Sequence, residues 1–217
     1  MNVDHEEWNV EVVADFREPG WFHIPRSMTT TEANAWVESA LVELGPLVGV
    51  RRWDGSVTSP DVLRDFLAVG VADEPSLPSI ATFQVWPIPG PAVLTCRVCL
   101  VERASVPDFT DVEGAVVHTV EAAELGTGIQ FSTRHSVEDG EGKVALFSVD
   151  LVFADDDVAV VFSLERSVAS MIAGAMPGLD VLKDLIRVTR HDGTQVRGHA
   201  PTNALNESPW EMVGNVR

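Results

Sequence analysis

The sequence predicts an α+β domain, with an antiparallel β-sheet of about six or seven strands flanked by helices in an α/β/α sandwich. Two observations lead to this fold class. From residue 116 to residue 167, apolar and polar residues alternate in successive segments that short turns separate, which is the pattern of antiparallel strands. Helical spacing of apolar residues occurs only before and after the strand-rich region, so the helices are expected to cover the sheet.

The first extended segments precede the first helix. Apolar residues alternate with charged ones from Val10 to Phe16, as in a half-buried strand. Glu18-Pro19-Gly20 predicts a turn, and residues 21–24 resume an extended conformation. Thr29 and Glu32 have the spacing of a capping box, in which the two side chains satisfy free amides at a helix start.

Two helices are expected next. Apolar residues recur with a helical period over 33–44, and Gly45-Pro46 predicts the helix end. A shorter helix is expected after Ser59-Pro60, with the serine as cap and the proline in the first turn. The inner face of this second helix is formed by three residues: Leu63, Phe66 and Leu67.

The remaining strands follow these helices. Strands are predicted over 80–86 and, beyond a proline-rich loop, from Leu94, where alternate residues occupy opposite faces. The block from 116 to 164 reads as successive hairpin strands, with Asp155-Asp156-Asp157 as a tight turn. Pro177 is expected to begin a final helix whose apolar stripe extends to Val188.

The sequence predicts one structured domain, 1–190, followed by a polar tail, 191–217, that lacks a periodic pattern and is expected to be mobile. A chain of 217 residues is long enough to bury a substantial core without a disulfide or a metal.

Composition narrows the classes of partner. The chain has 33 acidic and 15 basic residues, a net charge of −18, and no basic run. This composition argues against nucleic acid, which needs a basic face, and against anionic membrane surfaces. No apolar run has the length of a membrane span, and the N-terminus lacks the features of a signal peptide, so we expect a cytoplasmic protein. An acidic surface attracts basic protein partners, although acidity also simply keeps a protein soluble.

Three stretches carry a family resemblance: VHTVEAAELGTGIQFSTRHS, VALFSVDLVFADDDVAVVFSLERS and PGLDVLKDLIRVTR. Together with the upstream GWFHIP and the helix around Trp36, they resemble uncharacterised actinobacterial proteins with a PsbP-like α/β sandwich, most strongly over residues 116–190. The resemblance implies that fold, which elsewhere serves protein binding and assembly more often than catalysis.

The sequence contains no recognisable catalytic, cofactor or metal motif, and we predict no cofactor. Cys96-Arg97-Val98-Cys99 has a redox or zinc spacing, but it lies inside a predicted strand, where residues three apart point to opposite faces. We interpret these cysteines as structural thiols. His118 and His135 fall on adjacent predicted strands, so a pair that meets across the hairpin and senses pH or binds a metal is a minor alternative to ordinary packing.

Aromatic residues beside arginine are typical of protein interfaces. The candidate partner-binding residues are therefore Arg52 and Trp53, Trp86 beside the proline-rich turn, and Trp210 and Met212 in the polar tail. For each of them, ordinary packing or folding back onto the domain is the competing interpretation.

These observations favour a non-enzymatic interaction protein, such as an adaptor, chaperone or immunity-type protein, that uses an acidic surface. An enzyme with an unrecognised constellation is the less favoured interpretation. Two alternatives come from other classes: a module that binds a small apolar ligand through Trp21, Trp36 or Trp86, and a structural subunit of a larger secretion or phage-like assembly.

Overall fold

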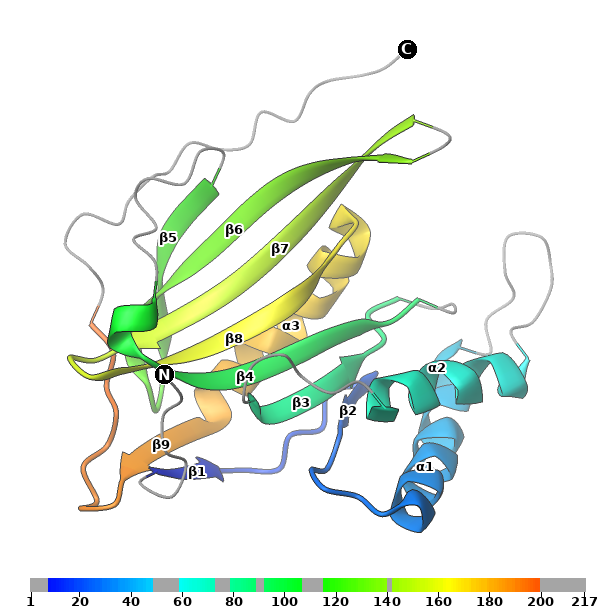
Figure 1. The fold of residues 1–217 in the computed structure, drawn as a ribbon, viewed down its shortest axis with the longest axis horizontal. Coiled ribbons are helices and arrows are strands. Elements are labelled where there is room, and N and C mark those ends of the chain that lie inside the picture. The colour runs from blue at the N-terminus through cyan, green and yellow to red at the C-terminus, as the bar shows by residue number, and fades with distance from the viewer. Residues whose placement is uncertain are drawn as a thin grey trace.

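The computed structural model describes residues 8–48, 59–72, 79–88, 92–106, 115–139 and 142–199. These residues form an antiparallel sheet and α-helices, so the predicted α+β class is confirmed (Figure 1). The strands are β1 (Trp8–Val12), β2 (Trp21–His23), β3 (Ser79–Val85), β4 (Leu94–Glu102), β5 (Ala115–Ala122), β6 (Gly126–Asp139), β7 (Gly142–Ala154), β8 (Val158–Ser167) and β9 (Ile186–Arg190). The helices are α1 (Thr30–Val48), α2 (Pro60–Ala72) and α3 (Ala169–Leu185), with a short 3-10 turn at Arg103–Ser105.

The main sheet has seven strands in the order β2-β3-β4-β8-β7-β6-β5, and every neighbouring pair is antiparallel. This number agrees with the six or seven strands predicted. A separate two-stranded sheet joins β1 to β9, so the beginning and the end of the described chain lie side by side (Figure 1). Val10 pairs with Val188 at the centre of this small sheet.

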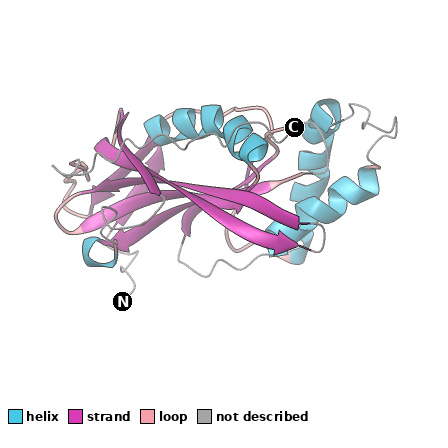
Figure 2. Ribbon diagram, turned by 90° about the horizontal axis from the view of Figure 1, so that it is seen from above, coloured by secondary structure: helices cyan, strands magenta, loops and turns pink. Residues whose placement is uncertain are grey.

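Helix α3 covers one face of the main sheet, as Figure 2 shows. Its buried residues recur with a helical period, so they form one apolar face. They pack on the inward side chains of β3, β4, β7 and β8 to form the largest core cluster. The helix contributes these residues to that cluster: Met171, Ile172, Ala175, Leu179 and Leu182.

Helices α1 and α2 form a hairpin that packs at the β2 end of the sheet (Figures 1 and 2). Phe22 and Trp86 join the buried residues of this hairpin in a second core cluster. The Gln84 side chain donates a hydrogen bond to the carbonyl of Phe66 at 2.7 Å, which connects β3 to α2. Within the described residues, the second helical layer therefore belongs to the β2–β3 end of the sheet.

The predicted helix starts at Thr29 and Ser59 are confirmed. Thr29 and Glu32 exchange the hydrogen bonds of a capping box. The Ser59 hydroxyl accepts from the amide of Val62 at 3.3 Å. The predicted end of the first helix at Gly45-Pro46 is wrong, because α1 continues to Val48. Proline removes one helical hydrogen bond, that of a carbonyl four residues earlier, at Val42, which is exposed.

The prediction for the last helix is also wrong at both ends. Helix α3 begins at Ala169, and Pro177 lies inside it. It ends at Leu185, and the residues from Ile186 onward form β9. Ile186 and Val188 are fully buried as predicted, but they alternate with Arg187 and Thr189 along a strand.

The polar tail predicted from residue 191 begins too early. Val196 is completely buried, and its amide donates to the carbonyl of Val188. Gly198 bridges to Gly126 at the start of β6. Residues 191–199 are therefore packed against the domain, and residues 200–217 lie outside the described residues.

Among the described helices, none combines the length and the apolar character that a membrane-spanning helix needs.

Candidate functional site

The candidate site is a groove at the edge of the main sheet, between β2 and α1, with a volume of about 190 Å³. We call it the β2–α1 groove and define it by its lining residues: Trp21, Phe22, His23, Trp36, Ser39, Ala40 and Glu43. Strand β2 supplies the first three residues, and one face of α1 supplies the others. Trp36, Ala40 and Glu43 share that face because they are spaced by four and three residues.

Trp36 fixes the distance between the two walls of the groove. Its indole N–H donates a hydrogen bond to the backbone carbonyl of His23 at 2.9 Å. The capping box at Thr29 and Glu32 defines where α1 begins, and therefore which residues of the helix face β2. The position of α1 beside β2 therefore depends on the capping box at Thr29 and on the hydrogen bond from Trp36 to His23.

Strand β2 presents backbone groups as well as side chains at this edge. Gly20, Phe22 and Ile24 pair with β3, as the bonds from Trp86 to Gly20 and from Ile24 to Thr82 show. Because backbone groups alternate in direction along an antiparallel strand, those of Trp21 and His23 point away from β3.

Two groups define the electrostatics of the groove. Burial lowers the pKa of the His23 imidazole, and the positive charge of Arg26 lowers it further. His23 is therefore neutral at neutral pH. Glu43 is the carboxylate among the lining residues, and no lysine or arginine is among them.

The Trp36 indole packs with Phe22 on the side of the sheet that faces α1. The rings of Trp21 and His23 instead lie against Phe83 on the α3 side.

The structure places Trp86 in the core. Its side chain is only 5% exposed, and it makes an edge-on contact with Phe66 at 6.0 Å between ring centroids. The prediction that Trp86 contacts a partner is therefore wrong, because the residue after β3 turns inward toward the α1–α2 hairpin. The other predicted partner-binding residues, Arg52, Trp53, Trp210 and Met212, lie outside the described residues and stay predictions.

The two cysteines lie in β4 as predicted, on opposite faces, and both are buried. Burial raises the pKa of both thiols, most strongly that of Cys96. Because the thiolate is the reactive form, this environment disfavours nucleophilic or redox chemistry. No group of three potential metal ligands occurs among the described residues.

The minor alternative, in which His118 and His135 meet across the hairpin, is wrong. His118 pairs in register with Gln130, whereas His135 pairs with Leu146 on the other side of β6. Five residues separate Gln130 from His135 along the strand, which is about 17 Å at the rise of a β-strand.

Sequence reasoning missed a row of polar residues on the sheet face opposite α3. Asp150 on β7 is paired with Ser163 on β8. Burial raises the pKa of the Asp150 carboxyl, and a hydrogen bond from Ser163 opposes this rise. On β6, the Thr133 hydroxyl lies 2.7 Å from His135 Nε2 and 2.6 Å from the Ser148 hydroxyl. The alternation of Ser148 and Asp150 with apolar residues along β7 was the available signal.

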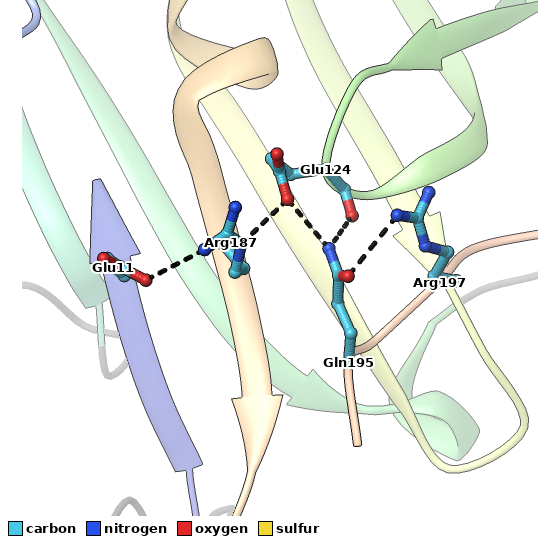
Figure 3. Close-up of polar contacts among 5 residues, drawn as sticks. All are labelled: Glu11, Glu124, Arg187, Gln195 and Arg197. Carbon is cyan, nitrogen blue, oxygen red and sulfur yellow. Dashed lines mark hydrogen bonds and ion pairs between the residues drawn. The ribbon is translucent and has the colours of Figure 1, made fainter. Parts of the chain in front are cut away.

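A second polar network closes the end of the domain, as Figure 3 shows. The Glu124 carboxylate accepts from Arg187 Nε at 2.8 Å and from Gln195 Nε2 at 3.0 Å. Arg187 also pairs with Glu11 at 3.3 Å, and Arg197 donates to Gln195. The hydrogen bond from Arg187 lowers the pKa of Glu124. These side chains satisfy one another, so the network links β1, β9 and residues 195–197 and has a structural role.

Comparison of the chain with protein-family models and with curated proteins gives no match.

Proposed function

We propose that this chain is a non-enzymatic, cytoplasmic interaction protein, of the adaptor, chaperone or immunity type, that binds a basic protein partner through the α1–α2 hairpin. The observation that carries the proposal is the charge of this hairpin. Helix α1 has three acidic residues and no basic one, and α2 has two acidic residues and one arginine. A negative surface attracts a basic partner and accelerates its encounter.

Exposed apolar residues on the same hairpin support the proposal. Eight large apolar side chains are exposed among the described residues, and four of them lie on α1 and α2. Val42 is 77% exposed and Val69 is 68% exposed, the two highest values of the eight. Contiguous exposed apolar side chains mark interaction surfaces, and these four lie on the two helices that carry the acidic residues. Arg52 and Trp53 lie in the connection between the two helices, so they remain candidates for the same surface.

The PsbP-like resemblance of residues 116–190 also supports a binding role, because that fold serves protein binding elsewhere. Fold analogy is weak support for function, so the charge and the exposed residues of the hairpin carry more of the argument.

The proposal predicts that association depends on salt and on the charge of the hairpin. The tagged full-length chain is used to capture a partner from its native lysate at low salt, and the association rate of the purified pair is then measured. The rate should fall steeply as salt rises, because screening weakens steering. Asp65→Lys on α2 should slow association about fivefold.

Asp156→Lys is the matched control, since it makes the same change of charge at an exposed position in the β7–β8 turn. That turn lies at the end of the molecule opposite the α1–α2 hairpin (Figure 1). A rate that salt does not change, or equal slowing by the two variants, would contradict the hairpin as the interface. Capture of many copies of one assembly component would instead favour the structural-subunit alternative, and the mass of the complex in solution distinguishes the two.

A further inference from the structure

Helix α2 is apolar on both its inner and its outer side over its second half. The stretch from Phe66 to Ala72 contains no polar side chain. Leu67 is completely buried, and Gly70 lies against the side chain of Gln84, so this side of the helix faces the domain. A helix that is apolar all round is normally covered all round, yet the outer side of α2 is exposed.

The exposed residues on the outer side of α2 form one continuous stripe. Val62, Asp65, Val69 and Ala72 are spaced by three, four and three residues, so they share one face of the helix. All four are exposed, Val69 at 68% and Val62 at 38%. We call these four residues the α2 stripe. Their spacing is the one along which a second helix packs in a helix pair.

The charges beside the α2 stripe are negative and lie toward one end. Asp61 and Asp65 are in the first half of α2, and the last turn carries no basic residue. Arg64, the one cation of this helix, pairs with Glu38 and with Asp61, each at 2.7 Å. Asp65 forms no ion pair within the part of the chain that the structure describes. The stripe therefore presents a carboxylate near its N-terminal end and apolar side chains toward its C-terminal end.

This distribution of charge selects the occupant. A helix that packs antiparallel to α2 brings its C-terminus beside Asp61 and Asp65, and lysine and arginine are most favourable in the last turn of a helix. The earlier turns of such a helix would remove Val69 and Ala72 from water with aliphatic side chains. A second copy of α2 fits poorly, because the antiparallel copy would place its own Asp61 and Asp65 over the apolar half.

We propose that the α2 stripe docks an amphipathic helix of the basic partner, antiparallel to α2. Aliphatic residues of that helix cover Val69 and Ala72, and a lysine or arginine in its last turns reaches Asp65 with its aliphatic stem along Val62. This inference rests on the proposed function for the source of the helix. The docking chemistry can be tested without the partner.

The test uses the ¹⁵N-labelled full-length chain and a synthetic peptide of about 16 residues, long enough to form a helix when bound. The peptide carries leucines and alanines on one stripe of its first half and lysines in its last turns. The backbone amide signals of Val62 and Val69 should shift on titration, whereas that of Val181 on α3 should not. A control peptide of the same composition, with the leucines spread around the helix, should bind at least about fivefold more weakly.

Val69→Ser should weaken binding of the peptide about fivefold, because an apolar contact at the centre of the stripe is lost. Val181→Ser makes the same change at an exposed valine of α3 and should leave binding unchanged. Asp65→Asn should weaken binding about threefold, and Asp156→Asn in the β7–β8 turn should not. Equal affinity for the two peptides, or equal effects of Val69→Ser and Val181→Ser, would overturn the assignment.

The failure of this inference can be distinguished from failure of the proposed function. If the peptide does not bind but Asp65→Lys still slows association with a captured basic partner, the helix assignment is wrong and the hairpin interface stands. If the peptide binds with the expected effects of the variants and no basic partner associates, the α2 stripe docks a basic helix and the proposed function fails.

Discussion

Trp36 and Asp150 show how far a residue's neighbours decide its role. The helical spacing of apolar residues in α1 correctly places Trp36 on the side that faces the domain. Its hydrogen bond to His23 could not be predicted from that spacing, because His23 belongs to β2. Asp150 lies in the most regular alternation of the chain, but it is a half-buried acid with a raised pKa rather than a fully solvated one. The spacing of apolar residues predicts which way a side chain points, whereas its hydrogen bonds and its pKa depend on what packs against it.

Asp150 makes a prediction about pH. Its carboxyl has a raised pKa in the folded state because of burial, so the folded chain binds this proton more tightly than the unfolded chain does. The contribution of Asp150 to the free energy of unfolding therefore falls as the pH rises from the pKa of this carboxyl in the unfolded chain through its higher pKa in the folded chain. Asp150→Asn keeps an acceptor for Ser163 and removes the half-buried charge.

We expect Asp150→Asn to raise the free energy of unfolding, relative to the original chain, more at about pH 7.5 than at about pH 4. Urea denaturation of both chains at the two values measures this difference. A constant difference would show that Asp150 keeps an ordinary pKa.

At the scale of elements, the hairpin strands were predictable and the ends of two helices were not. Alternation over β7 and β8 is strong because each of these strands has one face in the main core. On β6, Ile129 and Phe131 alternate with polar residues because they belong to a third core cluster. A proline can stand in the first turn of a helix or inside it, so the sequence around Pro177 led to the wrong prediction of a helix start. Strand β9 is short, and it forms because β1, far away in sequence, pairs with it.

The candidate site was predictable only in part, because it too depends on contacts between residues far apart in the sequence. Trp21 and Trp36 were named among three tryptophans for a ligand between sheet and helices, and both line the groove. Trp86 was the third, and it is buried beneath the α1–α2 hairpin. Sequence cannot separate these cases, because the groove exists only where α1 docks beside the edge of β2.

Two glycines on different helices give a paired prediction. A methyl group at Gly178 on α3 would collide with the indole of Trp21, whereas one at Gly45 on α1 would meet nothing within 4 Å. Gly178→Ala should destabilise the domain by about 1–3 kcal/mol, through overpacking. Gly45→Ala should stabilise it by up to about 1 kcal/mol, through helix propensity.

Thermal or urea unfolding of the two variants checks both signs. Gly178→Ala should also shift the NMR signal of the Trp21 indole N–H, since the added methyl group would contact that ring. Stabilisation by both substitutions would mean that α3 and β2 are not in the close contact described.

At the scale of the whole molecule, residues 191–199 belong to the fold. Val196 is fully buried although it lies in a polar stretch, and Gln195 joins the Glu124 network beside it. Val196→Ala should lower the free energy of unfolding by about 2 kcal/mol. Val181→Ala, at a side chain that is 40% exposed, is the control and should change it by less than about 0.5 kcal/mol. Equal effects, measured by urea unfolding, would contradict the burial of Val196.

The pairing of β1 with β9 has a consequence for the order of events during synthesis. Trp8 is opposite Arg190, and Glu11 is opposite Arg187, so the first described strand has no partner until the distant β9 has been synthesised. Contacts between distant parts of a sequence slow folding, and unpaired strands expose their edges in the meantime. Charged residues on an unpaired strand disfavour its pairing with another chain, and Glu11 on β1 is such a residue.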